Sequence, residues 1–357
     1  MQRRTLLAAL AASSALPLVA RAAAAAASSP SRDVLDTPAL VSPLAARSAL
    51  FGLARAEGRI VAVGQRGHIV FSDDAGASWQ QASVPVSSDL VAVSFPKRDG
   101  APRDFGWTVG HDGVVLHSAD RGRSWTRQLD GRSLGALLVA HYEKSGDAKW
   151  LGEAKRFAAQ GAENPFLDVS FQDAQTGYVV GAFGLLLRTR DGGRSWQPML
   201  HAADNPKALH LYAIVRVGND IFAVGEQGLA LRLDRDSDRF VALTLPYQGT
   251  LFGVTGTERA VVAYGLRGNV VRSSDAGRTW ASVATNVGVG LTAAAIDERG
   301  RIVLVSQAGH VLVSADDGAS FSAAKVERPL PAAAVVSAAA DTLVLAGPRG
   351  ASTLRLS

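Results

Sequence analysis

Val61-Ala-Val-Gly-Gln-Arg-Gly67 opens a sequence unit that closes with Ser72-Asp-Asp-Ala-Gly-Ala-Ser-Trp79. The unit has an apolar run, a Gly-x-x-Gly turn, a second apolar run and Ser/Thr-x-Asp-x-Gly-x-Ser/Thr-aromatic, which we call the Asp box. The second turn glycine recurs at Gly67, Gly113, Gly184, Gly228, Gly268, Gly309 and Gly350. The spacings are 46, 71, 44, 40, 41 and 41 residues, which is one period with a single insertion. Seven such units predict a repeat architecture.

Five units carry the complete Asp box. Its carboxylate can accept hydrogen bonds from backbone N–H groups across the turn, and its glycine can adopt positive φ. The closing aromatic side chain is large enough to fill the space between neighbouring sheets. We therefore assign a structural role to these residues: Asp74, Gly76, Trp79, Asp120, Gly122, Trp125, Asp191, Gly193, Trp196, Asp275, Gly277, Trp280, Asp316, Gly318 and Phe321. The box is degenerate in the fourth unit, at 233–240, and the seventh unit ends at Ser357 before any box.

Each unit contains about four short runs rich in Val, Leu, Ile and Ala, with turn residues between them, as expected for β-strands. Four-stranded units of this length form β-propellers. We therefore predict an all-β fold, a seven-bladed β-propeller. The seventh unit lacks its outer strand, and Val34-Leu-Asp-Thr-Pro-Ala-Leu-Val41 could supply it. We expect residues near 34–45 to close the ring in this way, which would remove an open sheet edge.

The first 27 residues indicate an export signal. Arg3-Arg4 precedes an apolar stretch from Leu6 to Ala20, and Ala20-Arg21-Ala22 offers a cleavage site. The stretch resembles a twin-arginine signal, with an ordinary secretory signal as the alternative. The formal charge of the chain is +5, and removing residues 1–27 leaves +2. This near neutrality argues against nucleic-acid binding, and the absence of cysteine excludes disulfides. We expect residues 28–357 to form a single, soluble, monomeric domain that does not span a membrane.

The full order of these motifs, including Arg188-Thr-Arg-Asp-Gly-Gly-Arg-Ser-Trp196, resembles the photosystem II stability/assembly-factor-like propellers built from bacterial neuraminidase (BNR) repeats. The resemblance covers about residues 34–357. It implies a non-catalytic scaffold or assembly factor that binds a protein client, such as a membrane-protein subunit or transporter component. It also implies a location in the periplasm, or in the thylakoid lumen of a photosynthetic host.

The alternative function is that of an exported carbohydrate-active propeller, either a sialidase-like glycosidase or a lectin-like glycan binder. A sialidase needs a Tyr–Glu nucleophile pair, three arginines and an acid. None of the five tyrosines shows that pattern, and Tyr178 and Tyr264 occupy strand positions. The seven histidines lack metal-ligand spacing. We therefore expect no catalytic residue, no metal site and no cofactor.

Candidate partner-binding residues fall in two sets of arginines. Arg66, Arg267 and Arg349 lie in the Gly-x-x-Gly turns, and we expect Arg66 and Arg349 to lie close together because blades 1 and 7 are neighbours in a closed ring. A second set, Arg188, Arg232 and Arg272, follows the second turn glycine by four residues in three consecutive units. It could form a basic ledge for a partner, or each arginine could pack between blades and pair with a neighbouring carboxylate.

The insertion, at about 132–162, predicts a helix that begins after Asp147 and ends at Gly161. It should share a face with the Gly-x-x-Gly turns, while the Asp boxes lie on the opposite face. Its apolar stripe, which includes Trp150 and Phe157, must pack either on the ring or on a partner. We expect these two aromatic residues to be partner anchors, so that deleting 132–162 abolishes client binding and leaves stability nearly unchanged.

Overall fold

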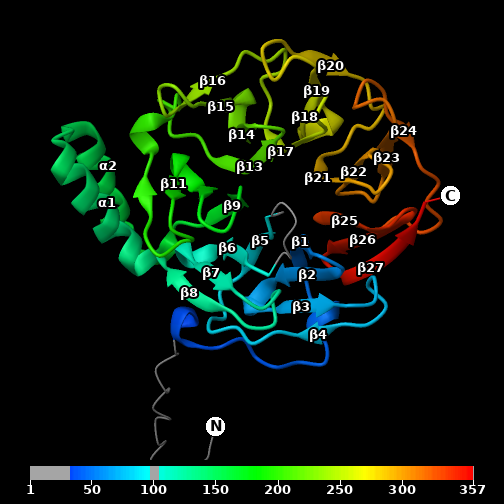
Figure 1. The fold of residues 1–357 in the computed structure, drawn as a ribbon, viewed down its shortest axis with the longest axis horizontal. Helices are drawn as coiled ribbons and strands as arrows, with labels where there is room; N and C mark the ends of the chain where they lie inside the picture. Colours follow the sequence, from blue (N-terminus) through cyan, green and yellow to red (C-terminus); the bar gives the residue numbers. More distant parts are fainter. Residues whose placement is uncertain (1–32, 97–103, 357) are drawn as a thin grey trace, which may run out of the picture. The chain divides into compact units, whose positions relative to one another are not determined.

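Residues 33–96 and 104–356 are described by a computed structural model, in which seven antiparallel sheets form a ring (Figure 1). Six of these sheets have four strands and the last has three. The predicted fold class, a seven-bladed propeller, is therefore confirmed. The expected export signal, residues 1–27, lies outside the described residues. Within the described ranges, no helix is long and apolar enough to cross a membrane.

The strands follow the chain from blade to blade and, within each blade, from the centre of the ring outward. Blades 1 and 2 contain β1 (Leu50–Ala56), β2 (Arg59–Gly64), β3 (Ile69–Ser72), β4 (Gln80–Gln81), β5 (Leu90–Ser94), β6 (Gly106–Gly110), β7 (Val115–Ser118) and β8 (Thr126–Leu129). Blades 3 and 4 contain β9 (Phe166–Phe171), β10 (Gly177–Gly181), β11 (Leu186–Thr189), β12 (Gln197–Pro198), β13 (Leu211–Val217), β14 (Asp220–Gly225), β15 (Ala230–Asp234) and β16 (Arg239–Ala242). Blades 5 to 7 contain β17 (Leu251–Gly256), β18 (Val261–Gly265), β19 (Val270–Ser273), β20 (Ala281–Val283), β21 (Leu291–Ile296), β22 (Ile302–Ser306), β23 (Val311–Ser314), β24 (Ser322–Ala323), β25 (Ala334–Ala339), β26 (Thr342–Gly347) and β27 (Gly350–Arg355).

The core lies between neighbouring blades, because each sheet presents apolar side chains to the sheet on either side. The second strand of each blade is buried almost throughout, as β2 and β18 illustrate. Between blades 2 and 3, the rings of Trp107 and Phe171 are stacked and Trp107 is fully buried. Apolar runs without alternation are what sheets covered on both faces require.

The segment before β1, residues 33–47, is here called the N-terminal strap, and it does not complete the last blade. Among the described residues β27 pairs only with β26, so the expected closure by residues 34–45 is wrong. Val34–Asp36 instead form a short 3-10 turn whose Leu35 is 1% exposed and packs against blades 1 and 2. The ring closes by packing of β1 against β25 and β26, with Leu50 and Ala346 in the shared apolar cluster.

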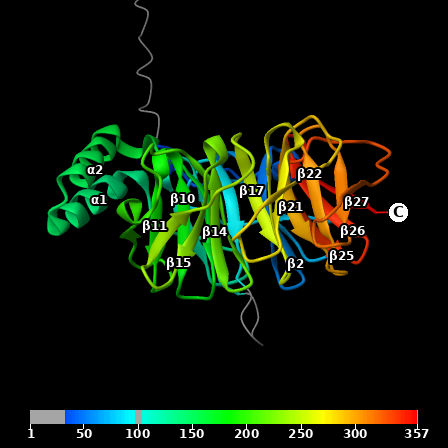
Figure 2. The same cartoon turned by 90° about the horizontal axis from the view of Figure 1, so that it is seen from above.

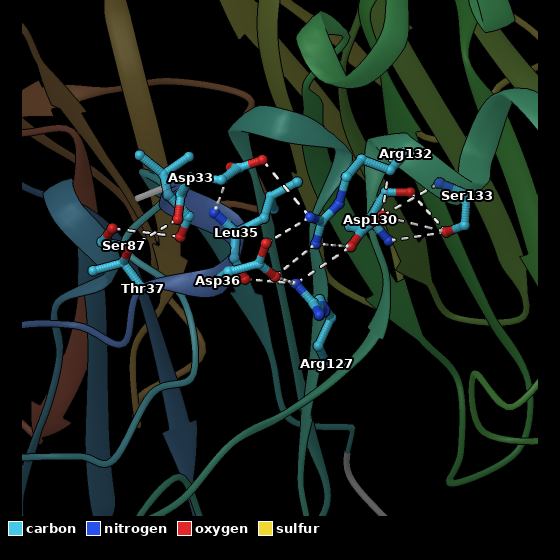
Figure 3. A network of polar contacts seen from close by, with 10 residues as sticks. Asp33, Leu35, Asp36, Thr37, Ser87, Arg127, Asp130, Arg132 and Ser133 are labelled. Carbon is cyan, nitrogen blue, oxygen red and sulfur yellow. Dashed lines mark hydrogen bonds and ion pairs between the residues drawn. The ribbon is translucent and has the colours of Figure 1, made fainter. Parts of the chain in front are cut away.

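Ion pairs explain why the strap lies on blades 1 and 2 (Figure 3). Arg132 donates to the Asp36 carboxylate at 2.8 Å and lies 3.7 Å from the Asp33 carboxylate. Arg127, on β8, lies 3.6 Å from Asp36 and 3.3 Å from Asp130. The acidic side chains of the strap thus meet arginines of blade 2 and the adjoining helix, which fixes Leu35 in its buried position.

The insertion forms a helical hairpin between β8 and β9, at the outer edge of the ring (Figures 1 and 2). The predicted helix is α2 (Ala148–Gln160), with Asp147 as its N-cap and Gly161 as its C-cap. A second helix, α1 (Gly131–Ser145), precedes it. The start of the hairpin contacts the turn of blade 2, since a Cβ at Gly113 would lie 2.8 Å from the Gly131 Cα. The hairpin therefore shares the face of the Gly-x-x-Gly turns, as expected.

Candidate functional site

The Gly-x-x-Gly turns each have an exposed or partly exposed residue just before the second glycine, at the tip of a tight loop, and we call this side of the ring the turn face. In blade 1, Arg66 and Gly67 adopt positive φ of 55° and 72°, while Gly64 is extended. A Cβ at Gly64 would lie 2.2 Å from the Ala49 carbonyl oxygen, so the first glycine permits a close approach of two backbones. Five tip residues share this left-handed conformation: Arg66, Asp112, Phe183, Gln227 and Arg267. Non-glycine residues rarely adopt it without a local reason.

Three exposed arginines flank the junction of blades 7 and 1. Arg66 and Arg349 lie on the tips of the two turns, and Arg47 lies on the strap. The strap runs beside both turns: a Cβ at Gly350 would lie 2.6 Å from the Arg47 Cα, and a Cβ at Gly67 would lie 3.2 Å from the Ala39 Cβ. Within 33–96 and 104–356, none of the three arginines forms an ion pair with an acidic side chain. We call them the junction arginines.

Sequence reasoning named Arg66 and Arg349 but missed Arg47. The repeat pattern locates turn residues, whereas Arg47 precedes the first unit and reaches this face only because the strap crosses the ends of two blades. Arg267, the third turn arginine named from the sequence, is also exposed, on the tip of the blade 5 turn.

The insertion adjoins the turns of blades 3 and 4 on the same face. The Arg156 guanidinium lies 4.6 Å from the Phe157 ring centroid and 5.4 Å from that of Phe183, which is 41% exposed. Phe183 in turn makes an edge contact with His210, with ring centroids 4.9 Å apart. The Glu226 carboxylate lies 3.7 Å from His210 Nδ1 and accepts a 2.9 Å hydrogen bond from the His210 backbone N–H. A mixed aromatic and charged surface thus connects α2 to blade 4.

The expected basic ledge is wrong, because its three arginines are occupied in bracing neighbouring blades. Arg188 is 4% exposed and donates to Asp238 of blade 4 at 2.5 Å. Arg232 donates to the Ala276 carbonyl of blade 5 at 2.8 Å, and Arg272 donates to the Asp317 carbonyl of blade 6 at 2.7 Å. Each guanidinium therefore binds the Asp-box turn, or its degenerate counterpart, of the next blade. The alternative reading of these arginines, as inter-blade braces, is the one that the structure supports.

The two expected aromatic anchors of the insertion differ in their surroundings. Phe157 is 2% exposed, in a cluster that also contains Leu134, Leu138 and Tyr142 of α1. It cannot serve as a surface anchor, because α2 buries its apolar stripe against α1. Trp150 is half-buried, and the Lys149 ammonium lies 4.8 Å from its ring centroid.

The Asp boxes are used internally, on the side opposite the turn face. In blade 1, Asp74 accepts a hydrogen bond from the Ser78 hydroxyl at 2.5 Å, one from the Ser78 backbone N–H at 2.8 Å and one from the Ser72 hydroxyl at 2.8 Å. These donors lower the pKa of Asp74 to about 2. The same bonds recur in the boxes of Asp120, Asp191, Asp275 and Asp316. These carboxylates are therefore turn formers.

The inner strands of the seven blades surround a central cavity of about 420 Å³. In six blades the strand register skips one residue next to the Gly-x-x-Gly turn, and all six skipped residues line the cavity: Phe51, Val91, Leu167, Tyr212, Phe252 and Thr292. Asp168 and Tyr264 line it as well. Sequence reasoning missed this ring, because a bulge leaves no mark in the pattern of apolar residues.

Asp168 is the acidic residue of the cavity lining. Its Oδ1 accepts from the Val169 backbone N–H and its Oδ2 from the Ile214 backbone N–H, both at 2.8 Å. Burial raises its pKa to about 7. Tyr264, a core tyrosine as expected, is 6% exposed, and burial raises its pKa too. Within the described part of the chain, no three His, Cys, Asp or Glu side chains are grouped to hold a metal ion.

Comparison with known proteins places these features in a family. The family described as "Photosynthesis system II assembly factor YCF48" matches residues 51–137 and 155–324. A curated relative is "Photosystem II assembly lipoprotein Ycf48" of Synechococcus sp. (strain CC9902), 28% identical over 139 residues. That alignment covers 38% of this chain and 32% of the relative, so the chain spans about a third of the relative's length.

Solved structures share the fold at low sequence identity. "YCF48 bound to D1 peptide" has a TM-score of 0.63 and 16% identity, covering 90% of this chain and 96% of the other. A GH74 enzyme of Niastella koreensis also has a TM-score of 0.63, with 12% identity, covering 86% of this chain and 52% of the other. The fold alone thus occurs with and without catalysis. The family match covers well over half of the chain and all blades except the last, and it is interrupted within the helical hairpin. This chain belongs to the photosynthesis system II assembly factor YCF48 family.

Proposed function

We propose that this protein is a non-catalytic assembly factor that binds a client protein through its turn face. The observation that carries the proposal is the contrast between two groups of arginines. Arg188, Arg232 and Arg272 are bound to neighbouring blades, whereas Arg47 and Arg66 are exposed and their guanidinium groups form no ion pair within the described ranges, the Asp89 carboxylate accepting from the Arg66 backbone N–H. Unpaired guanidinium groups on a rigid surface favour a carboxylate, which they can bind in a bidentate way.

The client segment that fits this surface carries acidic side chains or a carboxyl terminus. A relative in the family has been solved with a D1 peptide, which supports a client of the same kind, a membrane-protein subunit. Arg349 completes the junction arginines, and Arg267 adds positive charge on the blade 5 turn. Elsewhere on the turn face, Trp150 of the hairpin is half-buried and Phe183 of the blade 3 turn is exposed, and both add aromatic surface.

The test compares two double charge reversals. Arg66→Glu with Arg349→Glu changes the turn face, and Arg123→Glu with Arg278→Glu makes the same change in net charge at exposed Asp-box positions. Binding of the D1 peptide is measured by fluorescence anisotropy at several salt concentrations. We expect the turn-face variant to bind about tenfold more weakly, with a flatter salt dependence, because rim charges act over the Debye length.

The control variant should bind as the unmodified protein does. Equal losses in the two variants would show that only net charge matters, and unchanged binding in both would place the interface elsewhere. Either result would overturn the proposed surface. Circular dichroism of both variants checks that the ring is folded.

Two further aspects of the proposal rest on different residues. The absence of catalysis is supported by the Asp-box carboxylates, whose acceptor sites are taken by turn donors. Turnover of aryl glycosides would instead favour the glycosidase alternative.

Export to the periplasm, or to a thylakoid lumen, is supported by residues 1–27 and by the lipoprotein relative. Replacing Arg3-Arg4 by two lysines should retain the protein in the cytoplasm if the twin-arginine route is used.

A further inference from the structure

Asp168 is a carboxylate without a cationic partner among the described residues, at the wall of the central cavity. Two backbone amides, Val169 and Ile214, donate to it, and no Arg or Lys forms an ion pair with it among the described residues. An ionised carboxylate has about four acceptor sites, so two remain for another donor. Asp168 is partly exposed to the cavity, and a carboxylate without a cationic partner there attracts a cation.

The groups around Asp168 favour an organic cation. Tyr212 and Phe252 line the same cavity with ring centroids 5.8 Å apart in an edge arrangement. Tyr264 lines it too, and Gly253 makes room for this tyrosine, since a Cβ there would lie 2.1 Å from the hydroxyl oxygen. Aromatic faces attract ammonium groups and pack against aliphatic stems.

Other ligand classes fit less well. A divalent metal ion takes several oxygen or nitrogen ligands, and the described residues provide no group of three. An anion would meet the Asp168 carboxylate and, near Tyr212, the Glu226 carboxylate, which raises the pKa of that tyrosine in addition to its burial. A neutral apolar ligand would leave Asp168 unpaired.

The geometry points to a binding site in the central cavity for a primary ammonium group on a flexible aliphatic stem. The ammonium donates to the free acceptor sites of Asp168, and the stem lies against Tyr212 and Phe252. A lysine side chain of a polypeptide and a free alkylamine share this chemistry. The site is separate from the junction arginines, so its test does not depend on client binding there.

The experiment follows the backbone amide signals of Val169 and Ile214 by NMR, because both N–H groups donate to Asp168. The full-length protein is titrated with n-butylammonium, and with n-butanol as a neutral probe of the same length. A blocked glycine pentapeptide with a central lysine, and its norleucine counterpart, test the polypeptide source. We expect saturable shifts with the two ammonium probes, with Kd on the order of 1 mM, and none with the neutral ones.

Two variants and one change of pH complete the test. Asp168→Asn removes the charge and should weaken binding about tenfold or more. Tyr212→Leu keeps the Asp168 hydrogen bonds and should weaken it by a smaller factor, which keeps the test informative if the asparagine variant unfolds. Binding should also weaken as the pH falls from about 8 to about 5, because the carboxyl group becomes protonated. The other titratable groups of the lining, Tyr212 and Tyr264, stay neutral over this range.

Tighter binding of the lysine peptide than of n-butylammonium would identify a polypeptide as the source, and the reverse would identify a small amine. No saturable shift with either ammonium probe would overturn the site. Equal shifts with n-butanol would show an apolar cavity instead. Unchanged affinity in a folded Asp168→Asn protein would also overturn it.

Discussion

Replacing Arg188 by methionine separates its structural role from partner binding. Methionine keeps an unbranched stem between blades 3 and 4 but removes the hydrogen bonds to Asp238 at 2.5 Å and Gln197 at 2.9 Å. Charge-assisted hydrogen bonds contribute about 1.5–3 kcal/mol each. The Asp238 side chain is 49% exposed and regains water when its partner is lost. The Arg188 side chain is 5% exposed, so its charge lost hydration on folding, and this desolvation offsets a further part of the stabilisation from the two hydrogen bonds. We therefore expect the free energy of unfolding to fall by about 2 kcal/mol.

Urea denaturation followed by tryptophan fluorescence measures the change, with Arg349→Met as the matched control. Arg349 is exposed, so its replacement should change stability by less than about 0.5 kcal/mol. Binding of the D1 peptide should be affected the other way round: Arg349→Met should weaken it, and Arg188→Met should leave it unchanged. If Arg188→Met lowers the free energy of unfolding by less than about 0.5 kcal/mol, the proposed stabilising role of Arg188 between blades 3 and 4 is refuted. Such a result would show that desolvation cancels the gain from both hydrogen bonds.

Three other predictions concern the strap, the hairpin and the titration of the ring. Leu35→Ala should lower the free energy of unfolding by about 2–3 kcal/mol in urea titrations, because Leu35 is 1% exposed; Leu40→Ala, at a residue that is 75% exposed, should change it by less than about 0.5 kcal/mol, and equal losses would contradict the buried anchor. Replacing 132–162 by a short glycine-serine linker should lower the melting temperature and increase binding of an apolar dye, since the hairpin covers core residues of blades 2 and 3; an unchanged melting temperature would restore the expectation made from the sequence. The pKa of Asp168 is raised to about 7, so its folded state holds a proton that the unfolded chain has released, and its contribution to stability should fall as the pH rises from about 4 to 7. Asp168→Asn should flatten that slope in a series of urea titrations, and an identical slope would contradict the assignment.

The repeat pattern alone was sufficient to predict the number of blades, their order and the position of the turns. Each unit contains short motifs that predict its strands and turns: an apolar run, a Gly-x-x-Gly turn and an Asp box. The box hydrogen bonds join residues two to four positions apart, as between Ser72, Asp74 and Ser78. The helix cap at Asp147 is local in the same way. Hydrogen bonds between residues so close in the sequence can be predicted from a short stretch of sequence.

The ring closure, the arginine roles and the cavity depended on contacts between distant segments. Residues 34–45 precede the first unit and are expected from the sequence to supply the missing outer strand, yet Asp36 meets Arg132, which lies 96 positions away. Arg188 and Arg232 both follow the second turn glycine by four residues, and only the neighbouring blade decides that one binds the Asp238 carboxylate and the other the Ala276 carbonyl. Asp168 reaches the central cavity because β9 is the inner strand of its blade, one of seven that meet around the axis of the ring. Sequence periodicity indicates which residues alternate along a strand, but the free energy of an ion pair, or of a carboxylate in the central cavity, depends on the groups that another blade places against it.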